Sequence, residues 1–292
     1  MSRRGRALRM LALLLLVYAL PATLLSRSTS ALPTPSSAAN APIPPSAILP
    51  NPIPPSSILP SPPPVSPFTG LPTDLGASVL GVKIDNAARS RPQSGLELAD
   101  LVYVEPVEGG LSRLLAVYQS RFPTVVGPVR STRLTDLQLL ANFGRPALAF
   151  SGAAPEISAL MASAPVLDVS ELGRSGAYRR DRRRPMPHNL YGNANLLREG
   201  GAPPRDIGFR FGPPPPGGRA VPGTEVRYQA AAIGVQWVSA EARWVISMDG
   251  APLTSASGPR PGAATVVLQR VPVRDTPIHD ASGAPSPFAA TV

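Results

Sequence analysis

The polar residues that could do chemistry in this sequence stand at the ends of short apolar runs. Lys83 and Asp85 close the first run and share one of its faces, because side chains in a strand alternate. Glu105 closes the second run, and Glu108 follows it in a turn. Two neighbouring carboxyl groups can divide the roles of general acid and general base when their pKa values are split. The same residues also fit a plainer interpretation, a salt bridge between Lys83 and Asp85 with turn and cap roles for the glutamates.

A histidine supplies a third candidate for acid–base catalysis. His188 lies in a polar, proline-bounded loop at residues 187–191, where its imidazole could serve as a base near neutral pH. A purely structural histidine is the alternative. The candidate catalytic residues are therefore Glu105, Glu108 and His188.

Arginines provide the candidate anion-binding groups. Residues 127–133 lead directly into a predicted helix, so Arg130, Ser131 and Arg133 would stand beside its free backbone N–H groups and the positive end of its dipole. The full set of candidate ligand-binding residues is Lys83, Asp85, Asn86, Arg113, Arg130, Ser131, Arg133, Arg180, Asp181 and Asn189.

A second arginine-rich stretch covers residues 178–184. It fits either a solvated loop or an outer basic rim formed by Arg180 and Arg182. The stretch lacks the interleaved aromatic residues of a platform for single-stranded nucleic acid, so nucleic acid is not a favoured partner.

Several reaction classes are excluded by composition and motif. The chain of 292 residues has no cysteine, which removes disulfides, thiolate zinc sites and a cysteine nucleophile. There is no phosphate-binding P-loop, no His-Glu-x-x-His, no Gly-x-Ser-x-Gly and no dinucleotide-binding Gly-x-Gly-x-x-Gly. With only two histidines, a stable zinc or copper site is not favoured, and we expect neither a metal nor a cofactor.

Short strands and helices must position these residues. Apolar or β-branched runs between turn signals predict strands at residues 79–84, 101–105, 114–118 and 147–150. Helical spacing predicts helices at residues 134–143, 155–162 and 193–199, the first capped by Ser131 or Thr132 and the second with Pro155 in its first turn. The mixture predicts an α/β (mixed α+β) domain over residues 68–211.

A break rich in glycine and proline at residues 212–218 precedes a second unit. Strands are predicted at residues 226–229, 235–238, 244–248 and 265–273, with Asp249 and Gly250 as a hairpin turn. We expect a small β subdomain over residues 219–292 that is incomplete at its C-terminal end. The strand at 265–273 would then lose a neighbour and expose an edge. The break would insulate this unit, so limited proteolysis would leave a stable fragment of about residues 68–210.

The sequence of residues 1–67 indicates that the chain is exported. Four arginines precede an uncharged apolar run at residues 10–25, which as a helix would reach about 24 Å, short of the ~30 Å hydrocarbon core. Residues 1–31 are therefore a signal peptide or an uncleaved signal anchor. Removing them lowers the formal charge from +10 to +5. Residues 32–67 form an uncharged, proline-rich linker, which we expect to be disordered and extended, as either a spacer or a neutral tail.

Several short motifs occur in this sequence in the same order as in the YerB-like family, which the chain therefore resembles. The members are bacterial proteins described as lipoproteins, and their defining domain has no assigned function. The resemblance is carried by the strings at residues 68–72, 83–86, 91–96, 99–100, 107–110, 127–131, 180–181 and 187–191, and by 282–288 in the second unit. It implies the fold and a location in the cell envelope, and it implies no reaction. The lipobox cysteine of the family is absent here, which leaves secretion or a signal anchor.

Two functions remain open. The first is an exported, extracytoplasmic domain that binds an anionic envelope polymer or a protein partner, with membrane attachment through the N-terminal segment if that segment is uncleaved. The alternative is an envelope hydrolase or transferase that acts on a glycan, ester or phosphoester with the Glu and His candidates as acid and base. Co-location of Glu105, Glu108 and His188 in one cleft would favour the enzyme.

Overall fold

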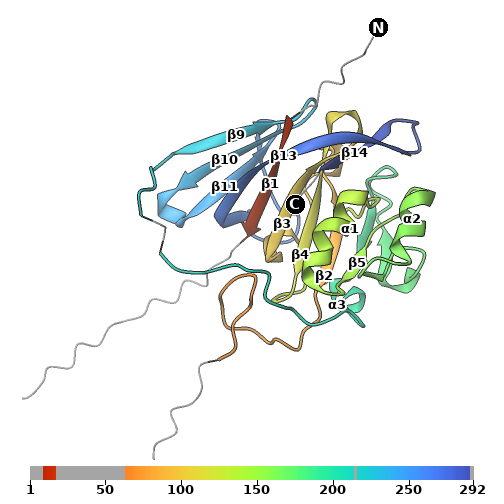
Figure 1. Cartoon of the computed structure of the whole chain (residues 1–292), viewed down its shortest axis with the longest axis horizontal. Helices are drawn as coiled ribbons and strands as arrows, with labels where there is room; N and C mark the ends of the chain where they lie inside the picture. The colour runs from red at the N-terminus through yellow and green to blue at the C-terminus, as the bar shows by residue number, and fades with distance from the viewer. Residues whose placement is uncertain (1–8, 18–62, 214–215, 290–292) are drawn as a thin grey trace, which may run out of the picture. The chain divides into compact units, whose positions relative to one another are not determined.

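The computed structural model describes residues 9–17, 63–213 and 216–289. Its main sheet has the strand order β6-β5-β2-β4-β3-β1-β13-β11-β10-β9 (Figure 1). The first half of the sheet comprises β2 (Leu80–Asp85), β3 (Leu101–Pro106), β4 (Ser112–Tyr118), β5 (Ala147–Ala149) and β6 (Leu167–Asp168). The second half comprises β9 (Gly223–Arg227), β10 (Ala232–Val238), β11 (Arg243–Met248) and β13 (Gly262–His279), and β1 (Arg9–Val17) joins the halves.

Shorter strands complete the fold. β12 (Ala251–Pro252) pairs with β11, and β14 (Pro285–Ala289) pairs with β13. β7 (Tyr178–Arg180) and β8 (Leu190–Gly192) form a separate two-stranded sheet. The pairing is antiparallel except between β2 and β5 and between β5 and β6. The predicted mixed α/β class is confirmed, and the hairpin turn at Asp249 and Gly250 joins β11 to β12 with positive φ at both residues.

The central strands are buried on both faces. Every residue of β2 and β4 is buried, which explains their continuous apolar sequence. One face packs against α1 (Leu134–Leu140) and α2 (Pro155–Met161), which cover this end of the sheet (Figure 1). The opposite face packs against α3 (Ala194–Leu197) and against apolar residues of the second half of the sheet. This two-sided cover leaves the polar ends of β2, β3 and β4 as the place where charged side chains gather.

The first helix begins later than its predicted cap. Arg133 is the residue that precedes α1, in an extended conformation, so the prediction of Ser131 or Thr132 as the cap is wrong. The carboxylate of Asp136 accepts a hydrogen bond from the Arg133 backbone N–H at 2.6 Å and another from the Thr132 hydroxyl at 2.9 Å. An acid inside the helix therefore replaces the cap, and it already occupies the positive end of the helix dipole.

The second half of the sheet is not insulated from the first. One apolar core runs through both halves, from Val104 in β3 to Ile246 in β11. Tyr228 donates a hydrogen bond to the Val104 carbonyl at 3.3 Å, and Arg91 forms an ion pair with Asp249 at 2.8 Å. The expected insulation at residues 212–218 is therefore wrong, because the break lies in a loop while the packing is made elsewhere.

The N-terminal run and the long strand β13 differ most from expectation. Residues 9–17 form a strand between β3 and β13, whereas the sequence predicted part of a targeting segment. β1 pairs with β13 along residues 263–272, so the predicted loss of a neighbour at 265–273 is wrong on that side. Among the described strands, the opposite side of residues 265–272 has no partner. The targeting role of residues 1–31 stays a prediction, and most of the proline-rich linker lies outside the described residues.

No helix in the described part of the chain has both the length and the apolar character needed to cross a membrane.

Candidate functional site

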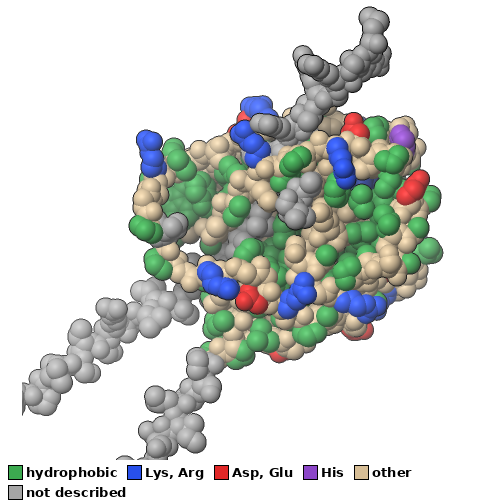
Figure 2. Space-filling model, in the orientation of Figure 1, with side chains coloured by type: hydrophobic (Ala, Val, Ile, Leu, Met, Phe, Trp, Pro, Cys, Tyr) green, Lys and Arg blue, Asp and Glu red, His purple; other side chains and the backbone are tan. Residues whose placement is uncertain are grey.

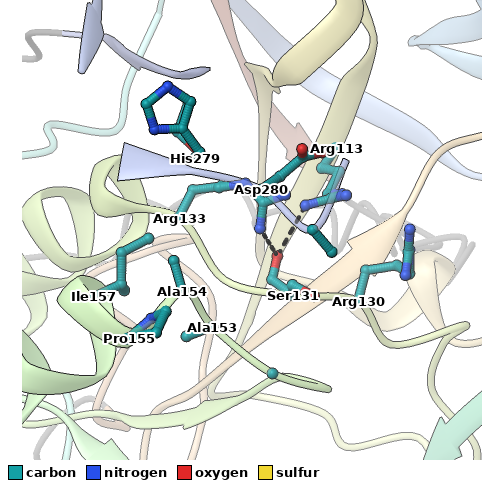
Figure 3. Close-up of a pocket in the computed structure, with 13 residues that line it drawn as sticks. Arg113, Arg130, Ser131, Arg133, Ala153, Ala154, Pro155, Ile157, His279 and Asp280 are labelled. Atoms are coloured by element: carbon teal, nitrogen blue, oxygen red, sulfur yellow. Dashed lines mark hydrogen bonds between the residues drawn. The ribbon is translucent and has the colours of Figure 1, made fainter. Parts of the chain in front are cut away.

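A cavity of about 410 Å³ opens beside the start of α1 and α2 (Figure 3). Arg113, Arg130 and Arg133 line it, together with Ser131. The chain before α2 supplies a small, mostly apolar wall, and the turn between β13 and β14 closes another side. The cavity therefore draws on segments more than 150 residues apart in the sequence.

Strand register explains the position of Arg113. In the antiparallel ladders, Arg113 of β4 lies opposite Asp85 of β2 and opposite Glu105 of β3. Paired residues of neighbouring strands share a face, so these three side chains project from the helix-covered face of the sheet. At the ends of the three strands, the basic side chain of Arg113 thus lies between the acidic side chains of Asp85 and Glu105.

Backbone hydrogen bonds fix the segment that carries the other arginines. The Arg130 N–H donates to the Lys83 carbonyl at 2.8 Å, and the Val129 N–H donates to the Leu190 carbonyl at 2.7 Å. The Ser131 carbonyl accepts hydrogen bonds from Arg113 at 3.2 Å and from Arg133 at 3.4 Å (Figure 3). One carbonyl therefore holds two guanidinium groups at the cavity. Arg133 also donates to the Thr132 carbonyl at 2.9 Å, whereas the Arg113 side chain makes no other hydrogen bond among the described residues.

Two of the three arginines have carboxylate partners. Arg133 makes a two-point contact with Glu108, at 2.6 and 2.8 Å, and Nε of Arg130 lies 3.1 Å from Oδ2 of Asp85. Burial tends to raise the pKa of Glu108, but hydrogen bonds from Arg133 and Ser286 outweigh it and the pKa is lowered. Glu108 is therefore an ionised partner of Arg133.

Arg113 is the exception. Among the described residues, no carboxylate lies within salt-bridge distance of its guanidinium. Burial, followed by the like charges of Arg133 and Arg130, lowers the pKa of Arg113 to about 10. Arg113 is therefore a buried guanidinium that lines the cavity beside two other arginines and makes no ion pair of its own among the described residues.

Asp85 connects the cavity to His188. Its Oδ2 lies 2.7 Å from Nδ1 of His188, and its Oδ1 accepts a hydrogen bond from the Ala87 N–H. His188 does not line the cavity. Oδ2 of Asp85 therefore contacts both the imidazole of His188 and the guanidinium of Arg130.

A second charged cluster lies deeper in the same sheet face. Nζ of Lys83 lies 2.7 Å from Asp136 and 3.2 Å from Glu105, and all three side chains are buried. The salt-bridge interpretation, which paired Lys83 with Asp85, is therefore wrong, because Lys83 pairs with Asp136 and Glu105 instead. Burial, and then the negative charge of Asp136, raises the pKa of Glu105 to about 8, although Lys83 opposes the shift. Glu105 does not line the cavity, and its contact with a cation is the one with Lys83.

The three candidate catalytic residues do not share one cleft. Glu105 belongs to the buried lysine cluster, Glu108 is held by Arg133 and Ser286, and His188 is held by Asp85. None of the three lines the cavity.

The remaining candidate ligand-binding residues lie away from the cavity. Asn86 projects from the other face of β2 and donates to the Ser112 hydroxyl. Arg180 contacts both oxygens of Glu171 at 2.8 Å and the side chain of Asn189 at 3.0 Å. Asp181 pairs with Arg183. The expected outer rim of Arg180 and Arg182 is therefore separate from the cavity, with Arg180 already paired and Arg182 exposed.

Sequence reasoning missed the contribution of the second half of the chain. His279 and Asp280 at the end of β13 and Ser286 in β14 line the cavity. Asp280 accepts hydrogen bonds from three groups in its own turn, with Ser282 the largest influence on its lowered pKa. The Asp-x-Ser-Gly pattern signals that turn, but nothing local in the sequence signals that the turn reaches Arg133.

A metal centre has no donor set here. In residues 63–213 and 216–289, no three His, Asp or Glu side chains gather as a metal ion would require.

Comparison with known proteins agrees with this architecture. Residues 68–206 match the family described as protein of unknown function (DUF3048), N-terminal domain. Over 71 residues the chain is 44% identical to "Putative lipoprotein YerB" of Bacillus subtilis (strain 168), a match that covers 23% of this chain and 22% of that protein. The crystal structure of YerB from Bacillus subtilis aligns with a TM-score of 0.55 and 21% identity, covering 76% of this chain and 79% of that chain. Residues 68–206 thus match the N-terminal domain of this family, and the expected relationship to YerB is confirmed by sequence and by fold.

Proposed function

We propose that this protein binds an anionic ligand, with the phosphate or carboxylate group of that ligand held in the cavity between Arg113, Arg130 and Arg133. The observation that carries the proposal is the position of Arg113, which is buried in the cavity wall beside two other arginines and has no carboxylate within salt-bridge distance in the described part of the chain. A buried charge of this kind costs free energy unless something pairs with it. A bound anion would supply the partner.

The chemistry of guanidinium favours oxyanions with two or more oxygens. Arginine presents parallel N–H donors in a planar fork that matches phosphate and carboxylate geometry. The cavity volume, about 410 Å³, lies in the range typical of small-ligand sites. It can hold one charged group with the adjoining part of a sugar or polyol, so the proposed ligand is a repeating unit of a phosphorylated or acidic polymer.

The cellular setting supports an envelope polymer as the source. The relative YerB is named as a lipoprotein, and the N-terminal sequence here has the basic and apolar regions of an export signal. A proline-rich linker then follows, which would let an exported domain reach away from the membrane. We therefore propose an extracytoplasmic location, with attachment through the N-terminal segment where it is not cleaved.

Basic side chains outside the cavity do not form a competing surface on the face seen in Figure 2. Arginine side chains are dispersed over that face among apolar, neutral and a few acidic residues. Dispersed charge of this kind gives weak, salt-sensitive attraction rather than a defined site.

The alternative, an acid–base hydrolase or transferase, has less support. Its three candidate residues contact different partners, and Glu108, which lies closest to the cavity arginines, is kept ionised by Arg133. An ionised carboxylate in an ion pair is a poor general acid.

Isothermal titration calorimetry of the full chain tests the proposal. The probes are inorganic phosphate and poly(glycerol phosphate), with neutral dextran as the blank, each at low and at physiological ionic strength. We expect saturable binding of a phosphate probe that weakens with salt, and at least a tenfold loss in Arg113→Gln, about 1.4 kcal/mol. Arg183→Gln, an exposed arginine far from the cavity, is the matched control and should bind as the parent does.

Either of two results would overturn the proposal. One is the absence of binding by folded protein at low ionic strength. The other is equal weakening by Arg113→Gln and Arg183→Gln, which would assign the binding to net charge instead of the cavity.

A further inference from the structure

One position in the sheet is filled by a segment that the sequence marks for another role. β1 lies between β3 and β13 (Figure 1), with residues 13–16 opposite 104–101 of β3 and residues 9–17 opposite 272–263 of β13. In the described sheet, β3 and β13 are neighbours only through β1. The apolar run at residues 10–25 is the same run that predicts export.

The strand β13 depends on this neighbour. Between residues 265 and 272, the described strands offer β13 no partner except β1, because β11 pairs only with Gly262 and Ala263 and β14 pairs from Val273 onward. Eight consecutive extended residues without a ladder would leave their backbone donors and acceptors unpaired. The extended form of this stretch therefore requires a strand between it and β3.

The sequence of β1 is poorly specialised for a sheet. Residues 9–17 read Arg-Met-Leu-Ala-Leu-Leu-Leu-Leu-Val, without alternation and with one β-branched residue. Leucine, methionine and alanine are better helix formers than strand formers. The ladders with β3 and β13 consequently require an extended backbone at this position. Hydrogen bonds between main chains would supply most of the recognition, as in strand addition by other proteins.

We infer that the position between β3 and β13 is a strand-acceptor site, and that its occupant is this chain's own segment Arg9–Val17. Export processing of residues 1–31, or insertion of the apolar run into a membrane, removes the occupant. Both edges are then open, over residues 101–104 of β3 and 263–272 of β13. A separate peptide with the sequence of this segment can then bind in the vacated site as an extended strand. This inference stands independently of the anion cavity.

Disulfide trapping in the full chain tests the occupant. The chain has no cysteine, so an engineered pair has no competing thiol. Leu14 and Val267 are register partners, and Leu14→Cys with Val267→Cys should give an intramolecular disulfide under mild oxidation. The matched control pairs Leu14→Cys with Arg270→Cys, three residues out of register, and should stay reduced. Equal oxidation of both pairs, no oxidation of the first pair, or a disulfide between two chains would overturn the assignment of the occupant.

Peptide exchange tests the acceptor site itself. A specific protease sequence placed between Ser57 and Ile58 allows the N-terminal fragment to be cut from the folded full chain. A fluorescent peptide of residues 2–17, soluble through its arginines, should then replace the fragment and bind saturably. The control peptide carries Leu13→Pro and Leu15→Pro, which removes two backbone donors, and should bind at least tenfold more weakly.

Two outcomes of the exchange experiment would contradict the inference. Equal binding of the two peptides would assign the uptake to general apolar attraction. Loss of the fragment with no change in hydrogen exchange at residues 263–272 would mean that β13 needs no strand beside it.

Discussion

Two clusters of charge lie on the same face of the same three strands, and they are built differently. In the inner cluster, Lys83 is enclosed by Asp136 and Glu105, and no side chain of the three is exposed. In the outer cluster, Arg113 faces a cavity with no carboxylate of its own among the described residues. The inner cluster pairs its cation within the fold, whereas the outer cluster leaves Arg113 available to the anionic ligand proposed above. Residue type alone does not distinguish a charged side chain that stabilises the fold from one that binds a ligand. What distinguishes them is whether the neighbouring side chains bury and pair the charge or leave it facing a cavity.

The inner cluster should dominate stability. Lys83→Met leaves the Asp136 side chain buried without its cation, and breaking a buried pair in this way costs about 3–5 kcal/mol. Urea or guanidinium unfolding followed by circular dichroism measures the change. A loss below about 1 kcal/mol would show that water enters the inner cluster and that the two clusters are alike.

Glu105 should give the inner cluster a characteristic pH dependence. Its pKa is raised to about 8 in the folded protein, so folding favours the protonated form. The stability it contributes is full below about pH 4.5, the ordinary value, and is lost as the pH rises through about 8. The free energy of unfolding should therefore decrease as the pH is raised from 5 to 9. The Glu105→Gln variant should show a smaller decrease over the same range.

Glu108→Gln is the control for the pH measurement. Hydrogen bonds from Arg133 and Ser286 lower the pKa of Glu108, so its contribution is lost at acidic pH instead. If Glu108→Gln, and not Glu105→Gln, removes the slope between pH 5 and pH 9, the assignment of the slope to the inner cluster is wrong.

The outer cluster should show the opposite relation between stability and function. Arg113→Met removes a buried charge that two neighbouring arginines repel, so the unfolding free energy should change by no more than about 1 kcal/mol or should rise. Binding of phosphate probes should fall at the same time. A large loss of stability would mean that Arg113, like Lys83, serves the fold.

The smallest effect is expected at the exposed arginine run. Arg183 pairs with Asp181 at the surface, where solvent screens the interaction. Arg183→Gln should leave the denaturant midpoint and phosphate binding unchanged within error. A measurable loss of phosphate binding would move the binding surface from the cavity to the arginine run.

Local patterns predicted most of the elements that carry the site. Pro155 in the first turn of α2 and the hairpin turn at Asp249 and Gly250 were found because one or two residues specify each feature. Arg130, Ser131 and Arg133 were found because residues 127–133 lead directly into the start of a helix.

Predictions failed where distant segments meet. The roles of Asp136 and Glu105 toward Lys83 depend on how α1 lies over the sheet, which no local pattern encodes. The approach of Ser286 to Glu108 joins residues 178 positions apart. The strand at residues 9–17 was not predicted, because a continuous apolar run is compatible both with a strand and with a membrane-directed segment.

The ladder between β1 and β13 also sets the timing of folding. Leu13 pairs with Leu268, so its partner is synthesised 255 residues later. At about 5–20 residues per second, the N-terminal segment waits on the order of ten to fifty seconds before that partner exists. Contacts so distant in sequence close late and slowly, after the local hairpins of β3 with β4 and of β10 with β11 have formed. If the chain is exported as proposed, a membrane or an export receptor would compete for residues 9–17 during that interval, before the sheet can close.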